Sequence, residues 1–110
     1  MNSKDKISFS EEQIRMATLA KAIAHPARIA ILQHLLDANE CICGDFVSKL
    51  PLSQSTVSQH LKELKNAGLI NASANPPKMM YCINKPTFDE LEQYFKNLVN
   101  RKAIKDCCEK

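Results

Sequence analysis

Residues 52–70 read LSQSTVSQHLKELKNAGLI and say more about the fold than any other stretch of the chain. Val57, Leu61 and Leu64 are spaced so that, in a helix, they form one apolar stripe that can face a core. The opposite surface carries short side chains that form hydrogen bonds, together with lysine. Gly68 readily takes the left-handed conformation that ends a helix. The stretch therefore predicts an amphipathic helix with a polar exposed face.

Two helices are expected at the start of the chain. Ser10 and Gln13 have the spacing of a capping box, which predicts the beginning of the first helix. Pro26 disfavours helical geometry at His25, and it suits the first turn of a second helix. Asn39 can end that second helix. The sequence therefore predicts two consecutive helices separated by a break at Pro26.

A short helix and a hairpin are expected on either side of the polar-faced helix. The short helix should run from about residue 41 to residue 50 and be closed by Pro51. Two strands are expected over residues 69–74 and 79–84, joined by a loop with Lys78 at its tip. The turn Pro51-Leu52-Ser53 then connects the short helix to the polar-faced one.

A long final helix is expected over residues 88–104, because Thr87 and Glu90 have the spacing of a capping box. The predicted order is helix, helix, short helix, tight turn, polar-faced helix, hairpin and helix. This is the order of a winged helix-turn-helix. We therefore expect a mainly α fold with a small β-hairpin.

Composition narrows the class of protein. With 45% hydrophobic and 25% charged residues, one folded domain is expected over residues 1–110, with residues 1–9 and 106–110 as flexible tails. Gly44 and Gly68 are too few for a Gly-rich phosphate loop, and 5% aromatics without Trp disfavour a base-stacking sheet. The chain has no run of about 18 apolar residues and no signal-peptide core, so we expect a cytoplasmic protein without a membrane partner.

The net charge of +3 falls in one part of the chain. Residues 1–40 and 86–110 are each balanced, whereas residues 41–85 carry five lysines against Asp45 and Glu63. A positive field concentrated in one segment suits a polyanionic partner, although an ordinary solvated surface also explains it. The lysines are Lys49, Lys62, Lys65, Lys78 and Lys85.

The polar-faced helix has the chemistry of a recognition helix for double-stranded DNA. Gln pairs bidentately with adenine, Ser and Thr bond to phosphates or base edges, and Lys contacts backbone phosphate. The alternative is a solvated helix face, since these residue types are common on any surface. The candidate DNA contacts are Ser53, Gln54, Ser55, Thr56, Ser58, Gln59, His60, Lys62 and Lys65, with Lys78 at the tip of the wing.

Three stretches resemble the ArsR/SmtB-type transcriptional repressors, namely residues 25–32 (HPARIAIL), 41–45 (CICGD) and 52–69. The resemblance covers roughly residues 14–100. It implies a homodimer, formed by the first and last helices, that binds operator DNA without a cofactor. It also implies release from the DNA when a metal or metalloid binds. The apolar stripes of the first and last helices fit this dimer, although core packing alone also explains them.

Five cysteines, an odd number, argue against a disulfide framework in a chain expected to be cytoplasmic. Cys82 is interpreted as a small core residue. Cys41 and Cys43 form one close pair, and Cys107 and Cys108 form another. Thiolate pairs select soft metals and trivalent metalloids such as As(III). Residues two apart in a helix point away from each other, so an ion held by the first pair must hold the short helix unwound and thereby disfavour DNA binding.

The resemblance also bears on which ligands complete a metal site. In arsenic-sensing relatives a Cys-x-Cys is followed three residues later by a third cysteine, a position that Phe46 takes here. A third ligand would then come from Cys107 or Cys108. The zinc- and cobalt-type site of other members needs histidines on the last helix. No histidine follows His60, so we do not expect that site. His25 and His34 are interpreted as structural.

Several alternatives stay open at this point. The cysteine pairs of the same DNA-binding fold can act as redox or persulfide sensors, or the chain can lack an inducer site. A small thiol enzyme using Cys43 with a histidine base is disfavoured, because the chain lacks a Cys-x-x-Cys motif and a glycine loop. A dimerisation module without DNA contact is a further possibility. We therefore expect a DNA-binding protein and not an enzyme.

Overall fold

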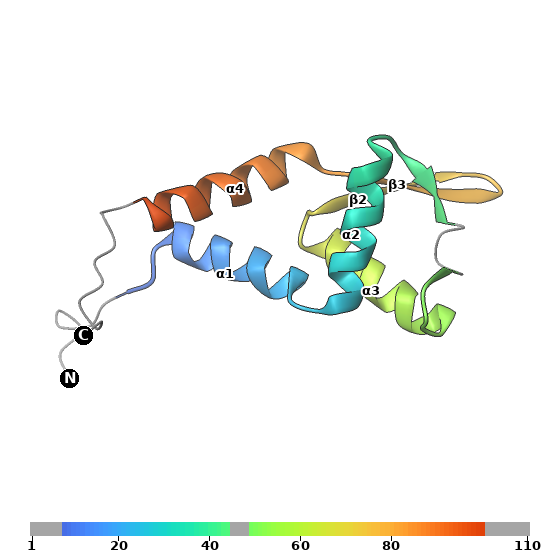
Figure 1. Ribbon diagram of the computed structural model, residues 1–110, viewed down its shortest axis with the longest axis horizontal. Coiled ribbons are helices and arrows are strands. Elements are labelled where there is room, and N and C mark those ends of the chain that lie inside the picture. Colours follow the sequence, from blue (N-terminus) through green and yellow to red (C-terminus); the bar gives the residue numbers. More distant parts are fainter. Residues whose placement is uncertain (1–7, 45–48, 101–110) are drawn as a thin grey trace, which may run out of the picture.

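The computed structural model describes residues 8–44 and 49–100, and its architecture is that of a winged helix-turn-helix (Figure 1). Four helices accompany a three-stranded antiparallel sheet in that part of the chain, so the predicted mainly α fold with a small β-hairpin is confirmed. The elements are α1 (Glu11–Ile23), α2 (Pro26–Ala38), β1 (Ile42–Cys43), α3 (Gln54–Asn66), β2 (Ile70–Asn75), β3 (Lys78–Ile83) and α4 (Lys85–Val99).

Local hydrogen bonds explain where α1 and α2 begin and end. The backbone N–H of Gln13 donates to Ser10 Oγ at 3.1 Å, and Gln13 Oε1 accepts from the Ser10 backbone at 2.9 Å, which is the predicted capping box. Pro26 occupies the first turn of α2, and the backbone N–H of Ala27 donates to His25 Nδ1 at 3.0 Å. Asn39 ends α2 in the left-handed conformation, with φ of 54°. Both predicted helices are therefore confirmed.

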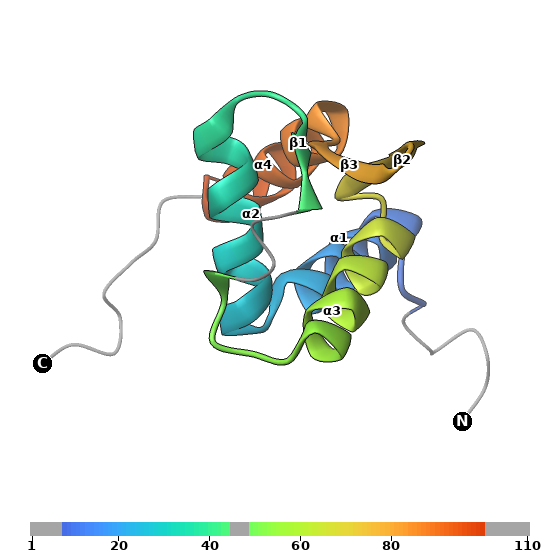
Figure 2. The ribbon, with the colours of Figure 1, turned by 90° about the vertical axis from the view of Figure 1, so that its right-hand side faces the viewer.

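The core lies where α1, α2, α3 and the sheet meet (Figure 2). The apolar stripe of α3 faces inward, with Val57 and Leu64 fully buried and Leu61 nearly so. Ile42, Tyr81 and Ile83 pack against this core from the sheet. The largest fully buried side chains are Leu19, Ile31, Leu35, Leu64, Leu69, Ile70 and Val57.

The sheet has the order β1-β3-β2, and β1 is a strand that the sequence did not predict. The hairpin of β2 and β3 is confirmed, with Ile70 opposite Ile83. The short helix expected over residues 41–50 is wrong at its beginning, since Ile42 pairs with Tyr81 in an antiparallel ladder. Pairing gives hydrogen-bond partners to the free edge of β3 while Ile42 packs on the core. Residues 45–48 of the expected helix lie outside the described residues.

The beginning of α4 also differs from the prediction. The helix starts at Lys85 after Asn84, which caps it without a side-chain hydrogen bond. Thr87, the expected cap, is instead buried inside the helix. Asn84 Nδ2 donates to the Gly68 carbonyl at 2.8 Å, which ties the helix start to the end of α3. Pro86 sits in the first turn and suits a helix beginning there.

Helices α1 and α4 run beside each other away from the rest of the fold, forming what we call the α1–α4 arm (Figure 1). Arg15 Nε donates to Glu90 Oε2 at 3.0 Å, and the Tyr94 hydroxyl donates to the same oxygen at 2.6 Å. The hydrogen bonds from Arg15 and Tyr94 lower the pKa of Glu90.

Among the described residues, none of the helices is long and apolar enough to cross a membrane.

We predict that Glu90→Gln destabilises the fold by about 0.5–1 kcal/mol at neutral pH, because a half-exposed ion pair contributes that much. The lowered pKa of Glu90 means that its contribution is present above the ordinary carboxyl pKa and is lost as the pH falls below it. Urea unfolding at fixed protein concentration and two pH values measures both effects. Glu92→Gln, on the exposed side of α4, is the control and should change little. If Glu90→Gln destabilised the fold as much at acid pH as at neutral pH, the ionised Glu90 carboxylate would not be the source of the stabilisation.

Candidate nucleic-acid interface

One side of α3 is exposed and polar along its whole length. Val57, Leu61 and Leu64 are buried on the inner side, as predicted. A rigid core therefore holds the helix while its outer face stays free to meet a partner. The exposed side chains of that face are Gln54, Ser55, Thr56, Ser58, Gln59, Lys62 and Lys65.

The N-terminus of α3 is built by three hydroxyl side chains. Ser53 Oγ accepts from the backbone N–H of Thr56 at 3.2 Å and donates to Thr56 Oγ1 at 2.8 Å. The hydroxyl oxygens of Ser53 and Ser55 lie 3.2 Å apart. Ser53 and Thr56 therefore hold the helix end, and their hydroxyls are already engaged with each other. An exposed helix N-terminus carries partial positive charge, which suits a phosphate group.

Gln59 is exposed on the second turn of α3, and its amide already has a partner. Gln59 Nε2 donates to Glu63 Oε2 at 3.1 Å, one helical turn further along the chain. This contact fixes the amide on the outer face of the helix. An amide nitrogen carries two N–H donors, so Gln59 can pair with a base edge while it keeps Glu63 as an acceptor.

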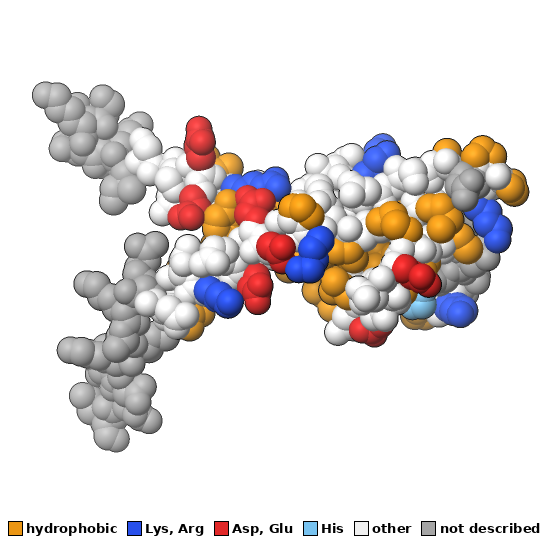
Figure 3. All heavy atoms as spheres, turned by 90° about the horizontal axis from the view of Figure 1, so that it is seen from above, with side chains coloured by type: hydrophobic (Ala, Val, Ile, Leu, Met, Phe, Trp, Pro, Cys, Tyr) orange, Lys and Arg blue, Asp and Glu red, His pale blue; other side chains and the backbone are white. Residues whose placement is uncertain are grey.

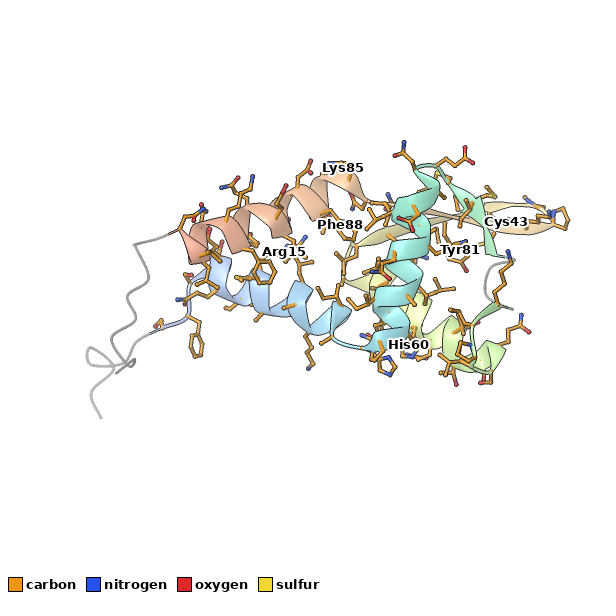
Figure 4. The ribbon with its side chains drawn as sticks, in the orientation of Figure 1. Arg15, Cys43, His60, Tyr81, Lys85 and Phe88 are labelled. Carbon is orange, nitrogen blue, oxygen red and sulfur yellow. A yellow bond between two sulfur atoms is a disulfide. The ribbon has the colours of Figure 1, made fainter. Side chains whose placement is uncertain are left out.

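His60 does not belong to the exposed face, and this corrects its prediction as a DNA contact. The side chain is buried, and its Nδ1 accepts from Arg28 Nε at 3.0 Å (Figure 4). Arg28 Nη1 also donates to the Ala22 carbonyl at 3.0 Å, and the ring of His25 lies 4.4 Å from that of His60. His60 thus joins α3 to α2. Its spacing of three residues after Val57 places it on the apolar stripe, a signal that the sequence already contained.

Burial is the main cause that lowers the pKa of His60, followed by the neighbouring His25 and Arg28. A neutral imidazole is required here because its Nδ1 accepts the hydrogen bond from a guanidinium. Arg28 and its contact with His60 are absent from the sequence-based prediction, since the two residues are far apart in the chain.

The wing is the hairpin of β2 and β3, which projects beyond the helices next to β1 (Figure 1). Lys78 opens β3 opposite Asn75 and is exposed near the tip. The hairpin thus presents the basic side chain of Lys78, and α3 presents the polar and basic side chains of its exposed face. The predicted position of Lys78 at the end of the hairpin is confirmed.

The cysteines are arranged differently from the prediction. Cys41 and Cys82 form a disulfide with Cα atoms 4.3 Å apart, so the expectation of a disulfide-free chain is wrong. Cys82 is half-buried and joined to Cys41, and is therefore not a core residue. Cys43 is free and half-buried. Cys107 and Cys108 lie outside the described residues.

The position of Cys43 removes one step of the predicted mechanism. Cys43 lies in β1, so the expectation that an ion must unwind a helix at Cys41 and Cys43 is wrong. Within residues 8–44 and 49–100, no group of three His, Cys, Asp or Glu side chains is arranged to hold a metal. The disulfide explains part of this absence, because it joins the sulfurs of Cys41 and Cys82 and leaves Cys43 as the free thiol among the described residues.

We predict that acidification through the ordinary histidine range destabilises the fold through His60. A histidine whose pKa is lowered by folding binds its proton more tightly in the unfolded chain, so the free energy of unfolding falls as the pH falls below about 6.5. His60→Gln keeps an acceptor for Arg28 and should flatten this pH dependence. Chemical unfolding over a pH series measures it, with His34→Gln at an exposed position of α2 as the control. If the free energy of unfolding of His60→Gln depended on pH as steeply as that of the wild type, His60 would not be the cause of the destabilisation.

Comparison with known proteins agrees with this architecture. The family described as "Bacterial regulatory protein, arsR family" matches residues 25–72. The transcriptional activator HlyU of Vibrio cholerae is 40% identical over 69% of each chain. Its solved structure superposes with a TM-score of 0.65 at 30% identity, covering 84% of this chain and 97% of the other.

Two further relatives match over much of their length. The transcriptional regulator YgaV of Escherichia coli is 30% identical over 89% of this chain and 97% of its own. The arsenical resistance operon repressor of Staphylococcus xylosus is 32% identical over 71% of this chain and 74% of its own. Together with the helix-turn-helix and wing described above, these matches show that the chain belongs to the ArsR family and is a DNA-binding transcriptional regulator, not an enzyme.

Proposed function

We propose that this protein is a homodimeric repressor that binds operator DNA through α3 and the wing, and that a thiophilic metal or metalloid bound by cysteine thiolates releases it. The observation that carries the proposal is the exposed polar face of α3 on a fully buried apolar stripe. A helix held in this way can enter a major groove without losing its own packing. The arsenical repressor of S. xylosus is among the relatives, which supports the inducer class.

Base reading is assigned to the side chains on the first two turns of α3. Gln54 and Gln59 carry amides that can pair with adenine, and Ser55 and Ser58 are short enough to allow close approach. Ser53 and Thr56 shape the helix end, and a phosphate that binds their hydroxyls would replace the hydrogen bond between them. The phosphate contacts that fix the register on the duplex are assigned to Lys62, Lys65 and Lys78.

Dimerisation is assigned to the α1–α4 arm, because its apolar side chains exceed what one core covers. Ile14 is 54% exposed, Leu98 57% and Val99 54%, and Phe95 is also exposed. Phe9 lies with α1 residues around a shallow pocket on the same arm. A second copy that packs against this surface removes it from water. Two copies related by a two-fold axis would place their α3 helices about one DNA turn apart, roughly 34 Å.

Release by a bound ion is assigned to Cys41 and Cys43 together with a third cysteine, a position for which the sequence offers Cys107 or Cys108. The Cys41–Cys82 disulfide favours a second candidate, in which oxidation of the same protein changes its DNA affinity. Operator binding by the reduced and the oxidised protein, each with and without arsenite, separates the two. Release by arsenite only in the reduced protein supports the first candidate, and release by oxidation alone supports the second.

We predict different effects of Gln59→Ala and Lys78→Ala on DNA affinity. Gln59→Ala should lose about 1–3 kcal/mol on the preferred site and relax sequence choice, because it removes a base contact. Lys78→Ala should weaken all sequences alike and lower the salt slope by about 1, because it removes a phosphate contact. Salt-titrated fluorescence anisotropy on a duplex selected from a random library, and on unrelated duplexes, measures both. Gln93→Ala on α4 is the control. Equal effects on all duplexes from both variants would contradict these roles.

We predict that Leu98→Asp yields a monomer with much weaker operator binding. A charge on the apolar surface of the α1–α4 arm must be buried for a second copy to pack there. Sedimentation equilibrium gives the oligomeric state, and anisotropy gives the DNA affinity. Met79→Asp, at a similarly exposed apolar position on the wing, should leave the oligomeric state unchanged. A dimeric Leu98→Asp protein would place the interface elsewhere.

A further inference from the structure

The ladder between β1 and β3 brings sulfur atoms from distant parts of the sequence to one side of the sheet. Ile42 pairs with Tyr81 and Cys43 with Met80, which continues the register to Cys41 opposite Cys82. Successive side chains of a strand point to opposite faces. Cys41 and Cys43, which flank Ile42, therefore share a face with Cys82 and Met80.

The opposite face of the same strands is the one that meets the core. Ile42, Tyr81 and Ile83 pack against the core cluster. A Cβ added to Gly44 would lie 3.2 Å from the Tyr81 ring, which puts Gly44 on that inner face as well. The sulfurs therefore lie on the outer face of the sheet. Figure 3 shows hydrophobic side chains on the surface at the end of the molecule opposite the α1–α4 arm. Figure 4 shows Cys43 on β1 in this region.

We propose that Cys41, Cys43 and Cys82, once the disulfide is reduced, form a three-thiolate site for a trivalent metalloid. This inference rests on the proposed function and names Cys82, and not a tail cysteine, as the third ligand. The disulfide demonstrates that the sulfurs of Cys41 and Cys82 meet without rearrangement of the strands. Cys43 is diagonal to Cys82, a separation of about 7–8 Å that only long side chains span directly, so an ion bound between the thiolates has to bridge part of this distance. Three thiolates complete a trivalent metalloid, whereas structural zinc takes four ligands.

The chemistry balances with a thiol reductant and arsenous acid. Reduction of the Cys41–Cys82 disulfide takes two electrons and two protons from a dithiol, which becomes a disulfide itself. The three thiols then form three arsenic–sulfur bonds, and their protons leave with the three hydroxyl groups of arsenous acid as three water molecules. No oxidation state changes in this second step. The site can therefore form only in the reduced protein.

A pocket of about 330 Å³ lies beside two of the three cysteines. Cys41 and Cys82 line it together with Leu36 and Ile83, whereas Cys43 is not part of its lining. Glu40 and Lys85 also line this pocket, and Lys85 Nζ donates to Asp89 Oδ1 at 2.6 Å.

The site connects two elements of the proposed DNA interface. Cys82 lies on β3, a strand of the wing, and Cys43 lies on β1, from which the chain continues to Ser53 at the start of α3. An ion bound by all three cysteines joins these segments in one fixed arrangement. A difference in ion affinity between the free and the DNA-bound arrangement would therefore change DNA affinity by the same factor.

The test uses the full chain reduced with a phosphine, because a thiol reductant competes for arsenite. Wild type, Cys82→Ser and the double variant Cys107→Ser/Cys108→Ser are titrated with arsenite and examined by native mass spectrometry. We expect wild type and the double variant to bind one arsenic atom per chain with loss of three protons. Cys82→Ser should lose this adduct. Met80→Leu is the matched control on the same strand and should keep it.

Circular dichroism and a second variant, Cys82→Ala, separate loss of the thiol from loss of the fold. A folded Cys82→Ser that keeps the adduct, together with a tail variant that loses it, overturns the inference and leaves the proposed function intact. An adduct on the strand cysteines that does not change operator affinity upholds the inference and contradicts release by metalloid. Failure of the reduced wild type to bind arsenite overturns both.

Discussion

The fold depends on the burial of one stripe of α3 against the helices and strands around it. Val57 and Leu64 are fully buried in a core that also contains Leu19, Ile31 and Leu35. The remaining surface of α3 does not pack against the core, and its side chains are polar and exposed. Loss of a buried leucine of this kind typically costs about 2–5 kcal/mol, a large share of the stability of a small domain. The geometry that would read DNA is thus set by hydrophobic packing on the other side of the helix.

Polar contacts then fix how α3 sits on its neighbours. Arg28 bonds both to His60 on α3 and to the Ala22 carbonyl on α1, so one guanidinium connects three helices. Asn84 bonds to the Gly68 carbonyl and joins the end of α3 to α4. Because these groups are half-buried or buried, loss of a partner leaves an unsatisfied polar atom. The position of α3 relative to the α1–α4 arm, where the second copy is proposed to pack, therefore depends on a few specific side chains.

Much of the fold and of the proposed DNA interface could be predicted because the relevant signals are local. The stripe of α3, the Ser10 capping box and Pro26 each act within a few residues, and the structure has all three. The spacing of His60 from Val57 places it on the buried stripe, whereas its polar residue type alone predicts exposure. Thr87 has the residue type of a helix cap, but the packing of α4 buries it, so the predicted start of this helix is wrong.

The sequence by itself determined the order of helices, the wing and the polar face of α3, because periodicity, caps and turns depend on neighbouring residues. Only the tertiary structure decided what residues 41–43 do. Their conformation depends on the edge of β3, a partner far away in the chain, and no local pattern encodes that pairing. The same pairing unites Cys41 with Cys82 and places Cys43 beside them. Contacts between distant segments are selected by the free energy of the whole core, and so they become visible only once the chain is folded.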